Sequence, residues 1–67
     1  MIEIHLNGDA RQVREGCPIT ELIDSLGLAG KRLAIEYNME ILPKSRHGET
    51  LLKAQDCVEI VHAIGGG

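Results

Sequence analysis

Aromatic side chains are almost absent from this sequence of 67 residues, in which Tyr37 is the single aromatic residue. The core must therefore be filled by Ile, Leu, Val, Ala and Met, and no row of rings is available on which the bases of single-stranded nucleic acid could stack. Basic residues are few and scattered, and the net charge is -3, whereas phosphate contacts require clustered Lys and Arg. We therefore expect no nucleic-acid partner, and we expect instead a protein partner with a basic docking face.

Long apolar runs are missing as well. No segment approaches the roughly 20 residues that span a bilayer, and the segment from Ile2 to Leu6 is too short and too charged for the apolar part of a signal peptide. This pattern predicts a cytoplasmic chain that does not bind a membrane. Cysteine is also scarce. Cys17 and Cys57 could form one disulfide, but in a cytoplasmic chain we expect both to be reduced, small hydrophobic side chains.

Residues that could form a metal centre or a catalytic site are not grouped in the sequence. His5, His47 and His62 are isolated from one another, and the two cysteines are far apart, so we expect solvated histidines and no metal. Neither a nucleophile beside a base nor a glycine-rich motif that cradles phosphate is present. The sequence therefore predicts a protein that is not an enzyme and holds no cofactor.

The composition that remains is that of one small globular domain. Hydrophobic residues make up 43% of the chain and charged residues 25%, which is typical of a soluble fold. The segment Ile2 to Leu6 alternates apolar and polar side chains, which is the period of a strand with one buried face. Asn7-Gly8 favours a tight hairpin turn, after which Ala10 to Arg14 can return as a second strand.

A helix and three further strands follow in the pattern. Ile19, Leu22, Ile23 and Leu26 form one apolar stripe at helical spacing, and Gly27 is well placed to end the helix in a left-handed conformation. Strands are then predicted from Leu33 to Tyr37, at Ile41-Leu42 before Pro43, and from Cys57 to His62, with a turn near Asn38 to Glu40 and a polar loop from Lys44 to Thr50.

The order of these elements predicts an α+β fold in which one helix covers one face of a mixed sheet of four to five strands. If the first and last strands pair in the centre of the sheet, the fold is a β-grasp, as in ubiquitin. We expect the domain to cover residues 1–64. The predicted core consists of Ile4, Leu6, Leu22, Ile23, Leu26, Ile35, Val58 and Ile60.

The sequence closes with Gly65, Gly66 and Gly67, which follow the last predicted strand after Ala63 and Ile64. Such residues can be a frayed chain end, and we expect them, with Ala63 and Ile64, to be mobile. A second interpretation is chemical. Because glycines carry no Cβ, an extended backbone can enter a narrow channel and place its terminal carboxylate against the α-phosphate of ATP in another enzyme.

Several segments together resemble the ThiS family of sulfur carriers in thiamine biosynthesis. They are Asn7-Gly8, Thr20 to Ile23, Ala34 to Asn38, Ile41 to Ser45, Asp56 to Val61, and the closing His62 to Gly67. The resemblance extends over the whole chain. It departs from the family at Gln55, where relatives often have Gly, and at Pro18, where they often have Thr. The first departure is expected to weaken a turn, and the second removes a capping hydroxyl from the helix.

The resemblance implies a function and its partners. An ATP-dependent adenylating enzyme would activate Gly67, a persulfide from a cysteine desulfurase would supply sulfur, and the thiocarboxylate would pass to thiazole synthase. Gly65 and Gly66 would form the narrow tether, and the sheet face away from the helix would dock the partners. Neither cysteine would be the sulfur-transfer centre. Three alternatives stay open: a carrier for another acceptor, like the small subunit of molybdopterin synthase; a ubiquitin-like protein modifier; and a small interaction domain.

Overall fold

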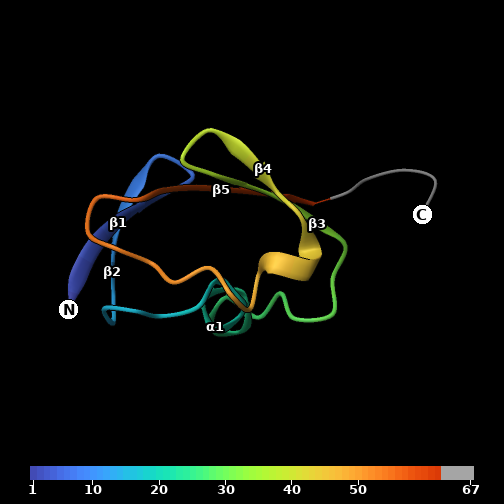
Figure 1. The fold of residues 1–67 in the computed structure, drawn as a ribbon, viewed down its shortest axis with the longest axis horizontal. Coiled ribbons are helices and arrows are strands. Elements are labelled where there is room, and N and C mark those ends of the chain that lie inside the picture. Colours follow the sequence, from blue (N-terminus) through green and yellow to red (C-terminus); the bar gives the residue numbers. More distant parts are fainter. Residues whose placement is uncertain (63–67) are drawn as a thin grey trace.

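The computed structural model describes residues 1–62 and consists of a twisted sheet with one helix packed on one face (Figure 1). The predicted tail of Gly65, Gly66 and Gly67, together with Ala63 and Ile64, lies outside the described residues. Within residues 1–62, no helix is long and apolar enough to cross a membrane.

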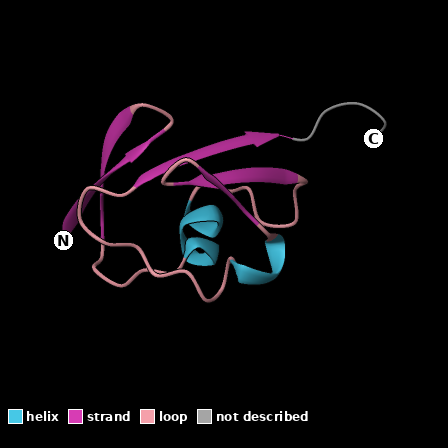
Figure 2. Cartoon of the chain, turned by 45° about the horizontal axis from the view of Figure 1, so that its top comes forward, coloured by secondary structure: helices cyan, strands magenta, loops and turns pink. Residues whose placement is uncertain are grey.

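Five strands form the sheet in the order β2-β1-β5-β3-β4. Along the chain the elements are β1 (Ile2–Leu6), β2 (Asp9–Val13), α1 (Ile19–Ser25), β3 (Leu33–Tyr37), β4 (Glu40–Leu42), the short 3-10 helix η1 (Lys44–Arg46) and β5 (Cys57–His62). The first and last strands lie side by side and run parallel, whereas the other neighbours are antiparallel (Figure 2). This arrangement confirms the predicted β-grasp fold, with β5 as the central strand.

The core lies between the sheet and α1. Six of the eight residues predicted as core are buried, and the cluster also contains Val13, Cys17, Ile19 and Leu52. The prediction was wrong for Leu6 and Leu26, which are only partly buried and pack against the edge of the cluster. Both stand at the end of an element, where the chain turns toward solvent: Leu6 precedes the β1–β2 turn and Leu26 is the C-cap of α1.

The two ends of α1 differ in how their backbone groups are satisfied. Pro18 is the N-cap and provides no side-chain hydrogen bond, as expected from the departure at this position. At the other end, Gly27 has a φ of +74° and its N–H donates to Asp24, while the N–H of Leu28 donates to Ile23. This pair of bonds is a Schellman motif, which confirms the predicted role of Gly27.

The polar loop after β4 differs most from the prediction. It contains η1, and the histidine that follows, His47, is only 7% exposed instead of solvated. Pro43 begins η1 as its N-cap, with no side-chain hydrogen bond. The loop ends at Leu52, which is 1% exposed and exchanges backbone hydrogen bonds with Cys17 and Gly16. These contacts hold the loop against the N-terminal end of α1.

Candidate functional site

The described part of the candidate site is β5, the strand that leads toward Gly65, Gly66 and Gly67. On one side β3 pairs with β5 from Tyr37 opposite Val58 to Leu33 opposite His62. On the other side β1 pairs only with the beginning of β5, where His5 and Leu6 lie opposite Cys57 and Val58. The second half of β5 therefore has a full backbone partner on one side only.

Asn7 extends the support of β5 beyond the end of β1. Its side-chain Oδ1 accepts a hydrogen bond from the backbone N–H of Ile60 at 2.8 Å, and its Nδ2 donates to the carbonyl oxygen of Ile60 at 3.3 Å. Its own backbone N–H donates to Val58 at 2.9 Å. Asn7 is also in the left-handed region, with a φ of +50°, which Asn tolerates better than most residues. The sequence identified Asn7 only as a turn residue.

A buried carboxylate fixes the beginning of β5. Asp56 is 6% exposed, and its side chain accepts hydrogen bonds from the hydroxyl of Tyr37 at 2.6 Å, the backbone N–H of Lys53 at 2.8 Å and Nδ2 of Asn38 at 3.3 Å. Asn38 in turn accepts a hydrogen bond from the N–H of Cys57 at 2.8 Å. Burial, and next the bond to Asp56, raise the pKa of Tyr37 to about 12. The turn before β5 is therefore held rigidly to β3.

The sheet face away from α1, here called the outer face, carries an exposed apolar patch beside the second half of β5. Ile41 and Val61 are 70% and 60% exposed. Val61 lies opposite Ala34, and Glu36 lies opposite both Ile41 and Glu59, so these five side chains share the outer face. A shallow hollow of about 300 Å³ lies among them. The outer face thus offers apolar contact flanked by two carboxylates.

The two cysteines occupy different environments. Both are free thiols, but Cys17 is buried whereas Cys57 is exposed at the beginning of β5, so the expectation that both pack is wrong for Cys57. The alternation of strand β5 places Cys57 on the outer face, opposite His5. Burial, and then the neighbouring carboxylate of Glu21, raise the pKa of the Cys17 thiol. A raised pKa lowers the thiolate fraction, and the thiolate is the reactive form.

The histidines do not form a cluster. His5 lies in β1, His47 follows η1 and His62 is exposed at the end of β5, as expected of a strand-end residue. Among residues 1–62, no group of three or more His, Cys, Asp or Glu side chains could hold a metal ion.

Comparisons with known proteins agree with this fold and this arrangement. The model of the ThiS family matches residues 4–67. The sulfur carrier protein ThiS of Bacillus subtilis is 38% identical over 65 residues, which cover 96% of this chain and 98% of that protein. The thiazole synthase of Magnetococcus marinus is 35% identical over 66 residues, but the chain spans only 20% of its length.

Among solved structures, the crystal structure of the thiamine biosynthesis protein ThiS from Geobacter metallireducens superposes with a TM-score of 0.85 at 30% sequence identity. The match covers 98% of this chain and 100% of that one. The family match over nearly all of the sequence, the full-length similarity to a sulfur carrier and the shared fold lead to one conclusion. The chain belongs to the ThiS family of sulfur carrier proteins.

Proposed function

We propose that this protein carries sulfur for thiazole formation in thiamine biosynthesis, as a thiocarboxylate on Gly67. The observation that carries the proposal is the position of β5: the central strand is fixed by Asp56 at its start and by Asn7 in its second half, and in the sequence only Ala63 and Ile64 separate its last residue from the three glycines. A strand held in this way fixes the position at which the following residues begin. The family membership and the Gly-Gly-Gly sequence support the same function.

The proposed chemistry takes place on the terminal carboxylate in the active sites of other enzymes. The carboxylate of Gly67 attacks the α-phosphate of ATP, which releases pyrophosphate and forms an acyl-adenylate. A persulfide then displaces AMP and forms an acyl disulfide, and a thiol of the sulfur-transfer system reduces this bond to release the thiocarboxylate. Gly65 and Gly66 permit the approach because neither residue adds a Cβ to the backbone that enters the narrow channel.

The outer face is the surface that we assign to the partner enzymes. Exposed apolar area beside polar groups is typical of protein interfaces, and the patch around Ile41 and Val61 extends over β5, its neighbour β3 and the edge strand β4. Glu36 and Glu59 favour partners whose own patch is surrounded by basic residues. The partners we propose are an ATP-dependent adenylating enzyme, a cysteine desulfurase as the sulfur source, and thiazole synthase.

Similarity to thiazole synthases favours thiazole synthase over other acceptors. Two such proteins, from Magnetococcus marinus and Paramagnetospirillum magneticum, contain a segment similar to nearly the whole of this chain. A carrier segment within the acceptor enzyme would keep donor and acceptor together. In this cycle the carrier catalyses no step itself, and we place it in the cytoplasm, where ATP and reduced sulfur are available.

The test is intact mass spectrometry after incubation with the adenylating enzyme, ATP and a persulfide source. The wild-type chain should gain the mass of one sulfur less one oxygen, whereas Gly66→Val should gain nothing and should not support ATP–pyrophosphate exchange. The Val variant should still bind the enzyme through the outer face, and Val61→Asp should reduce that binding. A double variant with Ser at Cys17 and Cys57 serves as the matched control and should load normally.

Three results would change the assignment. Exchange at the wild-type rate in Gly66→Val would contradict the entry of the tail into a narrow site. Loading without thiazole formation in the presence of thiazole synthase would indicate a carrier for a different acceptor. If lysine-linked conjugates accumulated on a denaturing gel instead of the thiocarboxylate, the chain would act as a protein modifier.

A further inference from the structure

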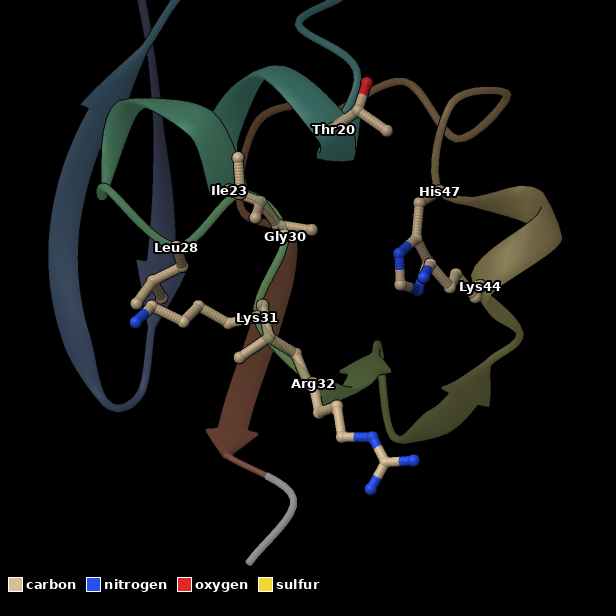
Figure 3. A pocket seen from close by; sticks show the side chains of 10 residues that line it. Thr20, Ile23, Leu28, Gly30, Lys31, Arg32, Lys44 and His47 are labelled. Carbon is tan, nitrogen blue, oxygen red and sulfur yellow. The ribbon is translucent and has the colours of Figure 1, made fainter. Parts of the chain in front are cut away.

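A second concave site lies on the helix side of the sheet, away from the outer face. It is a cavity of about 560 Å³ between α1, the segment 28–33 and η1 (Figure 3). The lining contains Thr20, Ile23, residues 28–33, Lys44 and His47. We call it the basic pocket, because its lining has two lysines, an arginine and a histidine but no Asp or Glu. The chain as a whole has more acidic than basic residues, 10 against 7, so this local composition is the reverse of the average.

The floor of the basic pocket is apolar and is shaped by the end of α1. The Schellman motif brings Leu28 back beside Ile23, and both side chains line the cavity. Leu33, at the start of β3, adds a third apolar side chain. Gly30, with a φ of +82°, turns the chain from the helix toward β3 without placing a side chain over the opening. The floor can therefore contact an apolar group while the opening stays clear.

His47 provides a polar group inside the basic pocket. The residue is only 7% exposed, and its Nε2 lies 3.2 Å from the carbonyl oxygen of Leu42. Because a carbonyl oxygen only accepts, this geometry assigns the proton of the neutral ring to Nε2 and leaves Nδ1 without one. Nδ1 has no hydrogen-bond partner among residues 1–62, and the ring reaches into the cavity (Figure 3). Once protonated, Nδ1 can donate to an anion in the pocket.

The charged side chains that line the basic pocket are all cationic. Lys44, on η1, lies beside the imidazole ring, while Lys31 and Arg32 extend outward from the segment before β3 (Figure 3). None of the three forms a salt bridge with another residue of the described chain. The helix α1 contributes Thr20 and Ile23 to the lining, neither of which carries a charge. An anion beside Lys44 would therefore meet positive potential, and no Asp or Glu side chain lines the pocket to oppose it.

We propose that the basic pocket binds a small organic anion, a carboxylate or phosphate on a compact apolar body. The apolar body would contact Ile23, Leu28 and Leu33, and the anionic group would lie between Lys44 and Nδ1 of His47. The cavity volume is within the range of small-molecule sites, about 300–1,000 Å³. Because Leu33 lies opposite His62, the ligand would occupy the same end of the sheet as the end of β5.

The experiment is a titration of the ¹⁵N-labelled chain, followed by amide chemical shifts, with 4-phenylbutyrate as the probe. Saturable shifts should appear at residues 28–33 and 44–47. The neutral analogue 4-phenylbutanol and inorganic phosphate should each bind at least about tenfold more weakly, because each lacks one half of the recognised chemistry.

Two charge-reversal variants complete the test. Lys44→Glu should weaken phenylbutyrate binding by at least about tenfold, because it replaces the nearest cation with an anion. Lys53→Glu changes charge equally, but in the turn at the opposite end of β5, and should bind like the wild type. Both positions are exposed, so the spectra should show an intact fold. Equal affinity for phenylbutanol, unchanged affinity in Lys44→Glu, or shifts confined to the outer face would each overturn the proposal.

Discussion

Replacing Asn7 by Ala should destabilise the domain far more than the position of Asn7 in an exposed turn suggests. The change removes both side-chain hydrogen bonds to the backbone of Ile60, in the half of β5 that β1 does not reach. It also places Ala at a φ of +50°, a left-handed backbone conformation that Ala tolerates less well than Asn. The effect should therefore have two components, one from hydrogen bonding and one from backbone conformation.

The two components can be given magnitudes. Leaving the partly buried backbone groups of Ile60 without partners costs about 1–3 kcal/mol, and holding Ala in the left-handed region costs about 1 kcal/mol more. Together, Asn7→Ala should lower the free energy of unfolding by about 2–4 kcal/mol, which is a large part of the total for a domain of this size. Asn7→Gly removes the hydrogen bonds without the conformational strain and should cost about 1 kcal/mol less than Ala.

Urea denaturation followed by far-ultraviolet circular dichroism measures both variants, and hydrogen exchange locates the effect. The amide of Ile60 should exchange faster in both variants, whereas the amide of Ile35, which lies opposite Ile60 on β3, should change only through global stability. Asn7→Asp keeps the acceptor for the Ile60 N–H and should preserve part of its protection. A stability of Asn7→Gly equal to that of the wild type would refute the reasoning, because it would show that the two hydrogen bonds contribute nothing.

Three further predictions concern stability. Leu22→Ala should lower the free energy of unfolding by about 2–5 kcal/mol, because Leu22 is 1% exposed in the core; a loss below about 1 kcal/mol in urea denaturation would contradict that role. Gln55→Gly should raise the free energy of unfolding by up to about 1 kcal/mol, because the φ of Gln55 is +70°. A lower urea midpoint than that of the wild type would contradict this prediction. The pKa of Tyr37 is about 12 in the folded chain, against an ordinary value of about 10, so the hydroxyl holds its proton more tightly when the chain is folded. The contribution of this hydroxyl to the free energy of unfolding is therefore complete below about pH 10 and is lost as the pH rises toward 12. Tyr37→Phe should be less stable than the wild type below pH 10 and should show a smaller decline above it, measured as the urea midpoint against pH.

The sequence allowed the elements to be predicted because their patterns are local. The alternation in Ile2 to Leu6, the apolar stripe of α1 and the glycine at its end each involve neighbours within a few residues. The central pairing of β1 with β5 was predicted only as a condition of the β-grasp fold, because no local pattern determines which strands become neighbours. Gln55 stands where relatives often have Gly, and the structure shows the reason for that preference: the residue adopts a positive φ, for which Gly is suited.

Features that depend on distant contacts could not be predicted. The bonds of Asn7 to Ile60 join residues from opposite ends of the sequence, and only the folded sheet brings them together. His47 was predicted to be solvated because it is isolated from the other histidines in the sequence, but the fold buries it after η1 and brings its Nε2 to the carbonyl oxygen of Leu42. Cys57 is exposed because the alternation of side chains along β5 places it on the outer face, opposite His5 in the register with β1. The basic pocket is likewise formed by three segments that are separate in the sequence.

The parallel pairing of β1 with β5 also determines how the chain must fold. His5 lies opposite Cys57, so the central pair of strands forms only after a loop of about 50 residues has closed. Contacts over such separations slow folding and make it cooperative, and on the ribosome they must wait until the last strand has been synthesised. A truncated or misfolded chain would therefore lack both the central strand and the outer face around Val61. Under the proposed function, partner enzymes that bind this face would select completed, folded carriers before any ATP is used.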